Sequence, residues 1–247
     1  MTRATGRGLT RPGRLARVDL RGVLSDVSGL GPFFTVRTDP AEAADPSWRP
    51  VAELETDGPA LRERISYVRG ALGDPEPRVA ASIAFQGIAA VIVSPPFAAA
   101  VLHSVVPALS PSDLHWRPMA GGPFPLWASR LVPFEKPLMA LYEQHLPSLV
   151  DAVRAIVPVS PRVLWGNVAS VVAGAAAMIA RGRPAAGARA FEVAAGLLDD
   201  GPLAGTGDLL PDRTFRRRSC CLYYRVPGGG TCGDCVLSGP GPRRSSR

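Results

Sequence analysis

Two long apolar stretches place the strongest limit on how this chain can fold. The first, Val79 to Val93, is apolar on almost every side, and the second, Leu164 to Ile179, repeats apolar residues at spacings of three and four. This spacing predicts α-helices, and a helix that is apolar all round must lie inside a core. The chain has 247 residues, of which 46% are hydrophobic, so it is long enough to bury both helices. We therefore expect a mainly α-helical fold.

Neither apolar stretch is predicted to span a membrane. The first is interrupted by Gln86 and, further along, by the pair Pro95-Pro96 and by His103. The second is too short, because a spanning helix needs about 20 uninterrupted apolar residues. Both stretches are expected to be buried core helices, and no transmembrane segment is expected.

Periodicity, proline and glycine predict the remaining secondary structure. Further helices with one apolar face are expected over residues 59–72, 137–157, 161–179 and 186–198. Pro95 and Pro96 are expected to end the first apolar helix and to open another that runs to about Val106, because proline disfavours helical backbone in the residue before it. Short strands or loops are expected over residues 18–37 and 110–134. The predicted fold class is thus mainly α-helical, an α+β fold with a few short strands.

Charge and composition divide the chain into three parts. Residues 1–17 predict a flexible basic arm, residues 18–200 a mainly helical body, and residues 201–247 hold all four cysteines and end in a flexible basic tail. The net charge is +7, but Lys136 is the only lysine, so part of the arginine reflects compositional bias, and no nucleic-acid partner is expected. No apolar signal segment follows the first arginines, so a cytoplasmic protein is expected.

The chemistry is concentrated in the pattern Cys-Cys-x10-Cys-x2-Cys, formed by Cys220, Cys221, Cys232 and Cys235. Four thiolates are the ligand set of a structural zinc ion or of an iron–sulfur cluster. Zinc sites usually bring their thiolates in two pairs, each spaced by two to four residues, so the adjacent pair favours a cluster. Neighbouring side chains of an extended segment point to opposite faces, so the chain must turn for both to reach one centre.

Basic and glycine-rich residues surround these cysteines. Arg216, Arg217, Arg218 and Arg225 lie close to them in sequence, and residues 228–230 are three glycines inside the loop. Positive charge and free backbone N–H groups would stabilise an anionic cluster and raise its reduction potential. The same arginines could instead steer an anionic partner to the site, or be solvated surface residues without a specific role.

The run RRRSCCLYYR over residues 216–225, followed by GGGTCGDC, resembles the C-terminal signature of the FhuF-type ferric-siderophore reductases. Residues 81–87 and 163–167 also resemble segments of that family, so the resemblance covers roughly residues 75–237. It implies a [2Fe–2S] cluster held by the four cysteines, a siderophore-binding helical body, and reduction of siderophore-bound Fe(III) so that iron is released inside the cell. Because no P-loop or dinucleotide-binding unit is present, the electrons would come from an external donor, a ferredoxin or a flavin reductase.

Four other side chains are weaker candidates. Trp165 and Asn167 could position the cluster loop or contact substrate, although a structural hydrogen bond is the commoner role of a buried asparagine. Trp116 and Trp127 could line a siderophore pocket or pack in the core. The three histidines match no metal or triad spacing and are expected to be structural. We expect the cysteine loop to pack on the helical body near Trp165. From the sequence alone, a structural zinc-binding module and a [2Fe–2S] redox sensor or electron-transfer protein stay open as alternatives.

Overall fold

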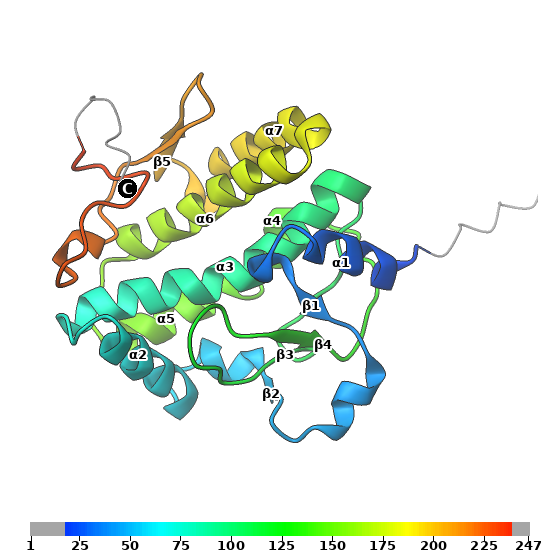
Figure 1. Ribbon diagram of the computed structural model, residues 1–247, viewed down its shortest axis with the longest axis horizontal. Coiled ribbons are helices and arrows are strands. Elements are labelled where there is room, and N and C mark those ends of the chain that lie inside the picture. Colours follow the sequence, from blue (N-terminus) through cyan, green and yellow to red (C-terminus); the bar gives the residue numbers. More distant parts are fainter. Residues whose placement is uncertain (1–17, 239–247) are drawn as a thin grey trace, which may run out of the picture.

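The computed structural model describes residues 18–238 and is mainly α-helical with a few short strands (Figure 1), which confirms the predicted fold class. In this part of the chain the α-helices are α1 (Leu20–Ser28), α2 (Pro59–Ala71), α3 (Pro77–His103), α4 (Leu138–Tyr142), α5 (Leu146–Ile156), α6 (Pro161–Gly182) and α7 (Gly187–Leu198). The predicted basic arm at residues 1–17 and the end of the basic tail, from residue 239 on, lie outside the described residues.

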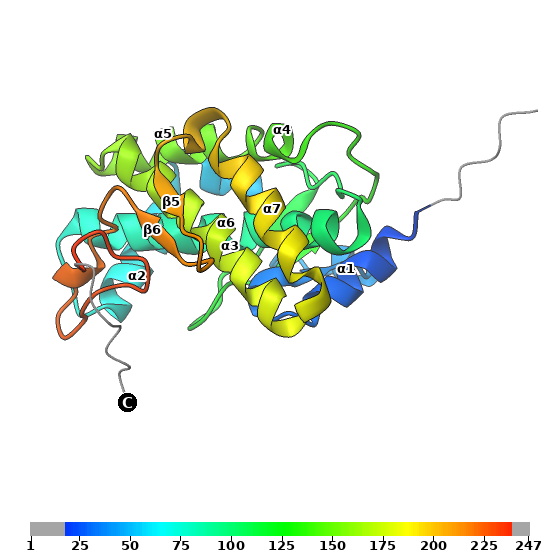
Figure 2. The same ribbon diagram turned by 90° about the horizontal axis from the view of Figure 1, so that it is seen from above.

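The core is built around α3 and α6, which lie side by side through the middle of the molecule (Figure 1). Helix α2 packs along α3, and α7 packs along α6 (Figure 2). Both central helices are long and apolar enough to cross a membrane by length and composition alone, but 72% of the most apolar part of α3 and 61% of that of α6 are buried inside this fold. Burial within the protein therefore accounts for their apolar sequence.

Helix α3 continues through Pro95 and Pro96 to His103, so the predicted helix end at the proline pair is wrong. Each proline lacks a backbone N–H and removes one hydrogen bond from the helix. Tyr142 donates a 3.1 Å hydrogen bond to the carbonyl of Val93 at this point. Because both prolines and their neighbours are buried, packing against the rest of the core outweighs the local preference.

A four-stranded sheet lies beside α3, with the strand order β1-β4-β3-β2. Its strands are β1 (Val36–Arg37), β2 (Arg49–Pro50), β3 (Leu114–Trp116) and β4 (Leu126–Ala128). Strand β1 pairs with β4 in parallel, whereas β3 is antiparallel to both β2 and β4. The strands predicted within 110–134 are confirmed. Residues 18–37 contain β1, but they also contain α1, which the sequence did not predict. The N-cap of α1, Asp19, accepts a 3.0 Å hydrogen bond from the N–H of Gly22.

The single helix predicted over residues 137–157 is wrong, because the structure has two helices there, α4 and α5. Pro147 lies in the first turn of α5, where its missing N–H removes no helical hydrogen bond. Between the helices, the buried His145 bonds Glu55 through Nδ1 at 2.5 Å and the carbonyl of Leu109 through Nε2 at 2.6 Å. Pro147 and the two hydrogen bonds of His145 therefore determine where α4 and α5 are separated.

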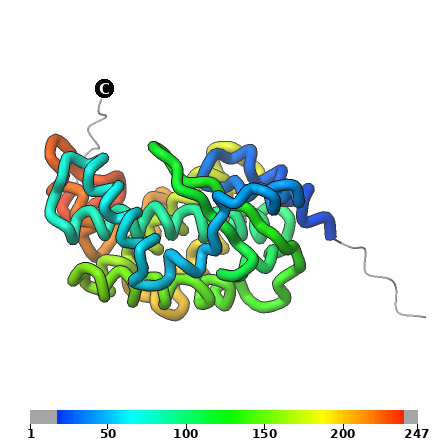
Figure 3. The backbone as a smooth tube through the Cα atoms, turned by 90° about the horizontal axis from the view of Figure 1, so that it is seen from below, coloured from blue at the N-terminus to red at the C-terminus, as the bar shows by residue number. Residues whose placement is uncertain are grey.

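The last part of the chain forms a hairpin and an irregular loop. Strands β5 (Gly207–Leu209) and β6 (Phe215–Arg217) pair antiparallel and lead into residues 218–238, which we call the cysteine segment. All three views place this orange-to-red segment at one end of the elongated molecule, with α1 at the other (Figures 1, 2 and 3). The segment packs on α6 and on the start of α3, as the sequence predicted for the cysteine loop.

Candidate metal centre

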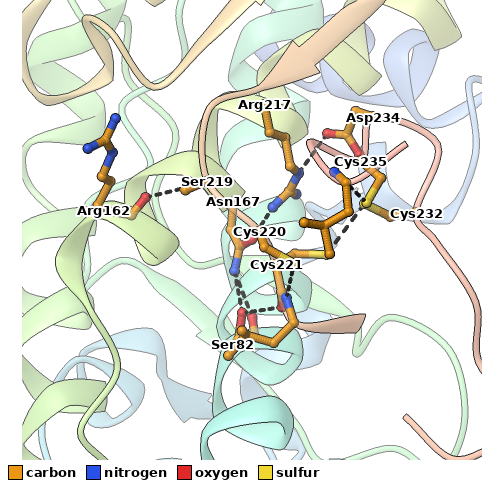
Figure 4. Close-up of polar contacts among 12 residues, drawn as sticks. Ser82, Arg162, Asn167, Arg217, Ser219, Cys220, Cys221, Cys232, Asp234 and Cys235 are labelled. Carbon is orange, nitrogen blue, oxygen red and sulfur yellow. Dashed lines mark hydrogen bonds and ion pairs between the residues drawn. The ribbon is translucent and has the colours of Figure 1, made fainter. Parts of the chain in front are cut away.

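The four cysteines lie in the cysteine segment, directly after β6 (Figure 4). All four are free thiols, and the Sγ atoms of Cys221 and Cys232 are 3.4 Å apart. Cys221 and Cys235 are buried, whereas Cys220 and Cys232 are partly exposed. The group of thiols therefore extends from the protein interior to its surface.

A left-handed turn at Leu222 redirects the chain directly after the adjacent pair Cys220-Cys221. Leu222 has φ 71°, a conformation that residues with a side chain rarely adopt. Its N–H donates a 3.3 Å hydrogen bond to Sγ of Cys220, and the N–H of Leu237 donates one of 3.4 Å to Sγ of Cys235. Such N–H donors stabilise negatively charged sulfur. The glycines 228–230, to which the sequence pointed for this role, make no such bond among the described residues.

The thiols differ in acidity. Its hydrogen bond with Cys232 lowers the pKa of Cys221 to about 6, and the positive charge of Arg217 acts in the same direction. The same hydrogen bond, together with burial, raises the pKa of Cys232. Burial raises the pKa of Cys220 as well. One thiolate of the contacting pair thus forms near neutral pH, and the thiolate is the form that binds metal.

Arg217 is the central charged residue beneath the cysteines. It is 1% exposed; its Nε donates to Oδ2 of Asp234 at 2.8 Å, and its Nη1 donates to Oδ1 of Asn167 at 2.6 Å (Figure 4). Its Nη2 is buried and has no hydrogen-bond partner among the described residues. The guanidinium favours the thiolate form of three of the four cysteines. One buried cation therefore connects the cysteine segment with the helical core.

Asp234, which lies between Cys232 and Cys235 in sequence, is the counter-ion of Arg217. Burial alone would raise the pKa of this carboxyl, but the charge of Arg217 and hydrogen bonds from Ser170 and Arg217 outweigh it, so the pKa of Asp234 is lowered. Asp234 also accepts a 3.1 Å hydrogen bond at its backbone carbonyl from the N–H of Arg217. The Cys-x2-Cys loop is thus fixed to β6 through both side chain and backbone.

Asn167 on α6 extends this network to α3. Its Nδ2 donates to the backbone carbonyl of Ser82 at 3.0 Å and to the Ser82 hydroxyl at 2.9 Å. The Ser82 hydroxyl in turn donates to the carbonyl of Cys221 at 2.9 Å. Both Asn167 and Ser82 are fully buried. A continuous chain of hydrogen bonds therefore runs from Asp234 through Arg217 and the core to the backbone of Cys221.

Two further contacts hold the cysteine segment on the helical body. The hydroxyl of Ser219 donates a 2.9 Å hydrogen bond to the carbonyl of Arg162 at the start of α6. It lies so close to Gly166 that a Cβ there would be 2.3 Å from the Ser219 hydroxyl. Further along, Arg225 forms a 2.6 Å ion pair with Glu76, the residue before α3. The segment is attached to both central helices.

The other candidates from the sequence lie outside this network. Arg218 is exposed and forms a 2.5 Å ion pair with Asp208, and Arg216 donates to the carbonyl of Ser238 at 3.2 Å. Trp165 is half-buried and packs against the core. Trp116 and Trp127 lie on the neighbouring strands β3 and β4, apart from the cysteine segment. Each histidine has a structural partner, as expected.

The residues present fit an iron–sulfur cluster. The chain supplies four thiols, backbone N–H groups already bonded to two of their sulfurs, and a buried guanidinium with an unpartnered Nη2 beneath them. Across residues 18–238, no group of three His, Cys, Asp or Glu side chains stands in metal-binding geometry, and Sγ of Cys221 contacts Sγ of Cys232. Cationic and N–H donors suit an anionic cluster.

A groove of about 400 Å³ lies next to the Cys-x2-Cys loop. Its floor is a row of small residues on α6, including Ala173, Gly174 and Ala177, and its walls include Arg213, Gly233 and Asp234. A Cβ added at Gly174 or at Gly233 would meet no atom within 4 Å, so the groove is open at both positions. It gives a small molecule access to the backbone between two of the cysteines.

Four free thiols, backbone N–H donors to two of them and a buried cation lie together in one segment docked on the helical body. In the comparison with protein families, residues 217–237 match the model described as FhuF 2Fe-2S C-terminal domain. All four cysteines fall within this range, which confirms the resemblance seen in the sequence, and the cofactor of this domain is a [2Fe–2S] cluster. The match does not extend over the helical body, and no curated protein matches the chain. The assignment of the individual cysteines as ligands stays a prediction.

Sequence reasoning missed three residues of the site. Asp234 lies inside the cysteine pattern, and its position between two cysteines was the available signal. Ser82 falls in the segment 81–87 that resembles the FhuF family, but nothing in its spacing pointed to Cys221. For Glu76, 149 positions from Arg225, the sequence contains no signal.

Proposed function

We propose that this protein is a cytoplasmic ferric-siderophore reductase that depends on its C-terminal iron–sulfur domain. The observation that carries the proposal is the FhuF 2Fe-2S match over a segment whose thiols reach the protein surface. A surface position supports exchange of electrons with a separate donor and a separate acceptor.

The chain's own residues would hold and tune the group. When bound, a [2Fe–2S] cluster supplies one-electron chemistry. Cys220, Cys221, Cys232 and Cys235 would hold it, and Arg217 would offset its negative charge from the protein side. The substrate, Fe(III) in a siderophore, gains one electron that originates from a ferredoxin or a flavin reductase and becomes Fe(II). The hard oxygen donors of a siderophore bind Fe(II) less tightly, so no acid–base catalysis is required for release.

The groove beside the Cys-x2-Cys loop supports an approach of the chelate to this centre. Its volume of about 400 Å³ lies within the range of small-molecule sites. Asp234 in its wall is neutralised by Arg217, so Arg213 leaves the wall attractive to oxygen-rich or anionic ligands.

The direct test uses anaerobically purified protein that has been chemically reduced. It is mixed with several ferric siderophores, and reoxidation is followed by visible absorbance while a chromogenic chelator traps Fe(II). We expect reoxidation to be faster than in buffer and one Fe(II) to appear per electron lost. Reoxidation no faster than in buffer with every siderophore would refute the reductase and favour a redox sensor. A colourless protein with stoichiometric zinc would refute the iron–sulfur assignment itself.

The groove is tested separately by filling it. Gly174→Leu projects a side chain into open space on α6, and the matched control Gly196→Leu does the same on α7, away from the cysteine segment. We expect Gly174→Leu to slow reoxidation by ferric siderophores while leaving reoxidation by a small inorganic oxidant unchanged. Equal rates for both variants with every siderophore would exclude the groove as the route of the chelate.

A further inference from the structure

A second pocket lies on the sheet side of the molecule, between α2 and the residues that follow β3. It has a volume of about 270 Å³ and is lined by Glu63, Arg64, Tyr67, Trp116, Pro118 and Met119, among others. None of its lining residues belongs to the cysteine segment. The volume is close to the lower end of the range for small-molecule sites, about 300 Å³, so only a small ligand would fit.

Arg64 brings a positive charge to the lining of this pocket. Its Nε is fully buried, and among the described residues it forms no ion pair and no hydrogen bond. Its guanidinium lies 5.3 Å from the ring centres of both Tyr67 and Phe124. Contact with aromatic faces compensates only part of the cost of removing a guanidinium from water. Burial also lowers the pKa of Arg64, in keeping with an environment that lacks a negative partner.

Trp116 supplies a second unsatisfied donor to the same pocket. It is 2% exposed, and its Nε1–H is buried without a hydrogen-bond partner among the described residues. Buried donors are nearly always satisfied in native proteins, and an unsatisfied one destabilises the fold. The two residues that carry these donors, on α2 and β3, both line one pocket. Because both nitrogens are buried, a ligand acceptor would satisfy them by displacing the side chains that cover them.

The surroundings of these donors are aromatic and fixed in place. Trp116 and Phe124 pack edge to face with ring centres 5.5 Å apart. The hydroxyl of Tyr67 accepts a hydrogen bond from the backbone N–H of Gly121, which ties the loop after β3 to α2. Glu63 brings an exposed carboxylate to the rim, 3.8 Å from Arg49, which also pairs with Glu53 at 2.6 Å. A flat apolar ligand body would therefore meet aromatic and apolar walls.

We propose that this pocket binds a small planar organic anion, an aromatic carboxylate, whose oxygens accept hydrogen bonds from Arg64 and Trp116. A guanidinium is planar and matches a carboxylate in geometry and charge. The ring of the ligand lies against Tyr67 and the apolar residues Pro118 and Met119. This site stands apart from the metal centre, and the proposal does not depend on the redox activity.

The test measures binding of benzoate and salicylate to the full-length protein by ligand-observed NMR and calorimetry, with benzamide as the uncharged comparison. Trp116→Phe keeps an aromatic ring but removes the donor together with part of the indole, whereas Arg64→Met removes the charge. Arg62→Met is the matched control, because Arg62 is an exposed arginine on the same helix, paired with Asp57. We expect a loss of affinity on the order of 10-fold for Arg64→Met, a smaller loss for Trp116→Phe, and no change for Arg62→Met.

A purely structural role for the two donors predicts a different result. If the Arg64 donor is reserved for a ligand, Arg64→Met leaves the melting temperature of the ligand-free protein unchanged or raises it, and abolishes the stabilisation by benzoate. Trp116→Phe is assessed by its affinity alone, because it also removes buried packing atoms. Equal binding of benzoate and benzamide by the wild type, or no binding of either carboxylate, would overturn the proposal. Unchanged affinity in Trp116→Phe together with Arg64→Met would do so as well. Should Arg64→Met not fold, the affinity of Trp116→Phe for benzoate relative to benzamide still decides the matter, because this variant keeps an aromatic side chain and the charge of Arg64.

Discussion

Replacing Arg217 with methionine tests whether the buried arginine fastens the cysteine segment to the fold. Methionine nearly retains the length of the side chain but removes its charge and all its donors. In the native structure the Arg217 side chain is fully buried, and that of its partner Asp234 is 18% exposed. The substitution leaves Asp234 without its counter-ion and Oδ1 of Asn167 without the donor that lies 2.6 Å away.

The magnitude follows from the burial of the pair. Breaking a buried ion pair by removing one partner costs about 3–5 kcal/mol, because the remaining charge is left without compensation. The exposed neighbour Arg218 provides the comparison, since it also forms an ion pair, at 2.5 Å with Asp208, but both side chains are nearly half exposed. Solvent screens such a pair, so Arg218→Met is expected to cost less than about 1 kcal/mol.

The assay is denaturant unfolding of the anaerobically purified protein, followed both by circular dichroism of the helices and by visible absorbance. We expect Arg217→Met to lose its visible absorbance at a lower denaturant concentration than Arg218→Met. Adding Asp234→Asn to Arg217→Met should restore part of the lost stability, because it removes the uncompensated charge. Removal of the positive charge should also shift the reduction potential to a more negative value. Equal free energies of unfolding and equal potentials for the two methionine variants would refute the role assigned to Arg217.

Three further predictions follow from the same contacts. Gly166→Ala places a Cβ against the Ser219 hydroxyl and displaces its hydrogen bond, so it should lower the free energy of unfolding by about 1 kcal/mol. As a control, Gly166→Ala combined with Ser219→Gly should lower it no more than Ser219→Gly alone. Since the pKa of Asp234 is lowered in the folded state, its contribution to stability is complete above its ordinary pKa of about 4 and is lost as the pH falls through the lowered value; Asp234→Asn should remove this acid-dependent step from the pH profile of unfolding. Cys221→Ser should yield protein with little iron and weak visible absorbance while the circular dichroism of the helical body is unchanged, and normal iron content would contradict its assignment as a ligand.

The parts of the site that the sequence predicted are those with a short-range pattern. The cysteine spacing and the resemblance to the FhuF family predicted the cofactor, and the solitary asparagine on an apolar helix pointed to Asn167. The contacts that attach the segment join residues far apart in the chain: Ser82 and Cys221 are 139 positions apart. Such a contact depends on how α3 and α6 bring two segments together, and no local spacing records it.

The errors in the fold have one physical cause, the effect of tertiary packing on local preferences. Pro95 and Pro96 are helix breakers in isolation, but inside the core α3 gains more from burying both faces than it loses in two hydrogen bonds. At α1 the apolar residues Leu20, Val23 and Val27 have helical spacing and are buried, but they lie within a short segment that also suits strands. Short apolar runs are the segments in which periodicity distinguishes helix from strand least well.

Strand alternation explains why only one of three consecutive arginines serves the metal centre. Side chains of a strand point alternately to opposite faces, and in β6 the buried Phe215 fixes which face is inward. Arg217, two residues later, shares that face and is buried, whereas Arg216 and Arg218 point to the surface side and find Ser238 and Asp208. A register shift of one residue would bury Arg216 or Arg218 instead and move the charge away from Asp234. The position of the phenylalanine relative to the arginine run therefore decides which charge reaches the cysteines, and this relation is readable in the sequence once the strand is known.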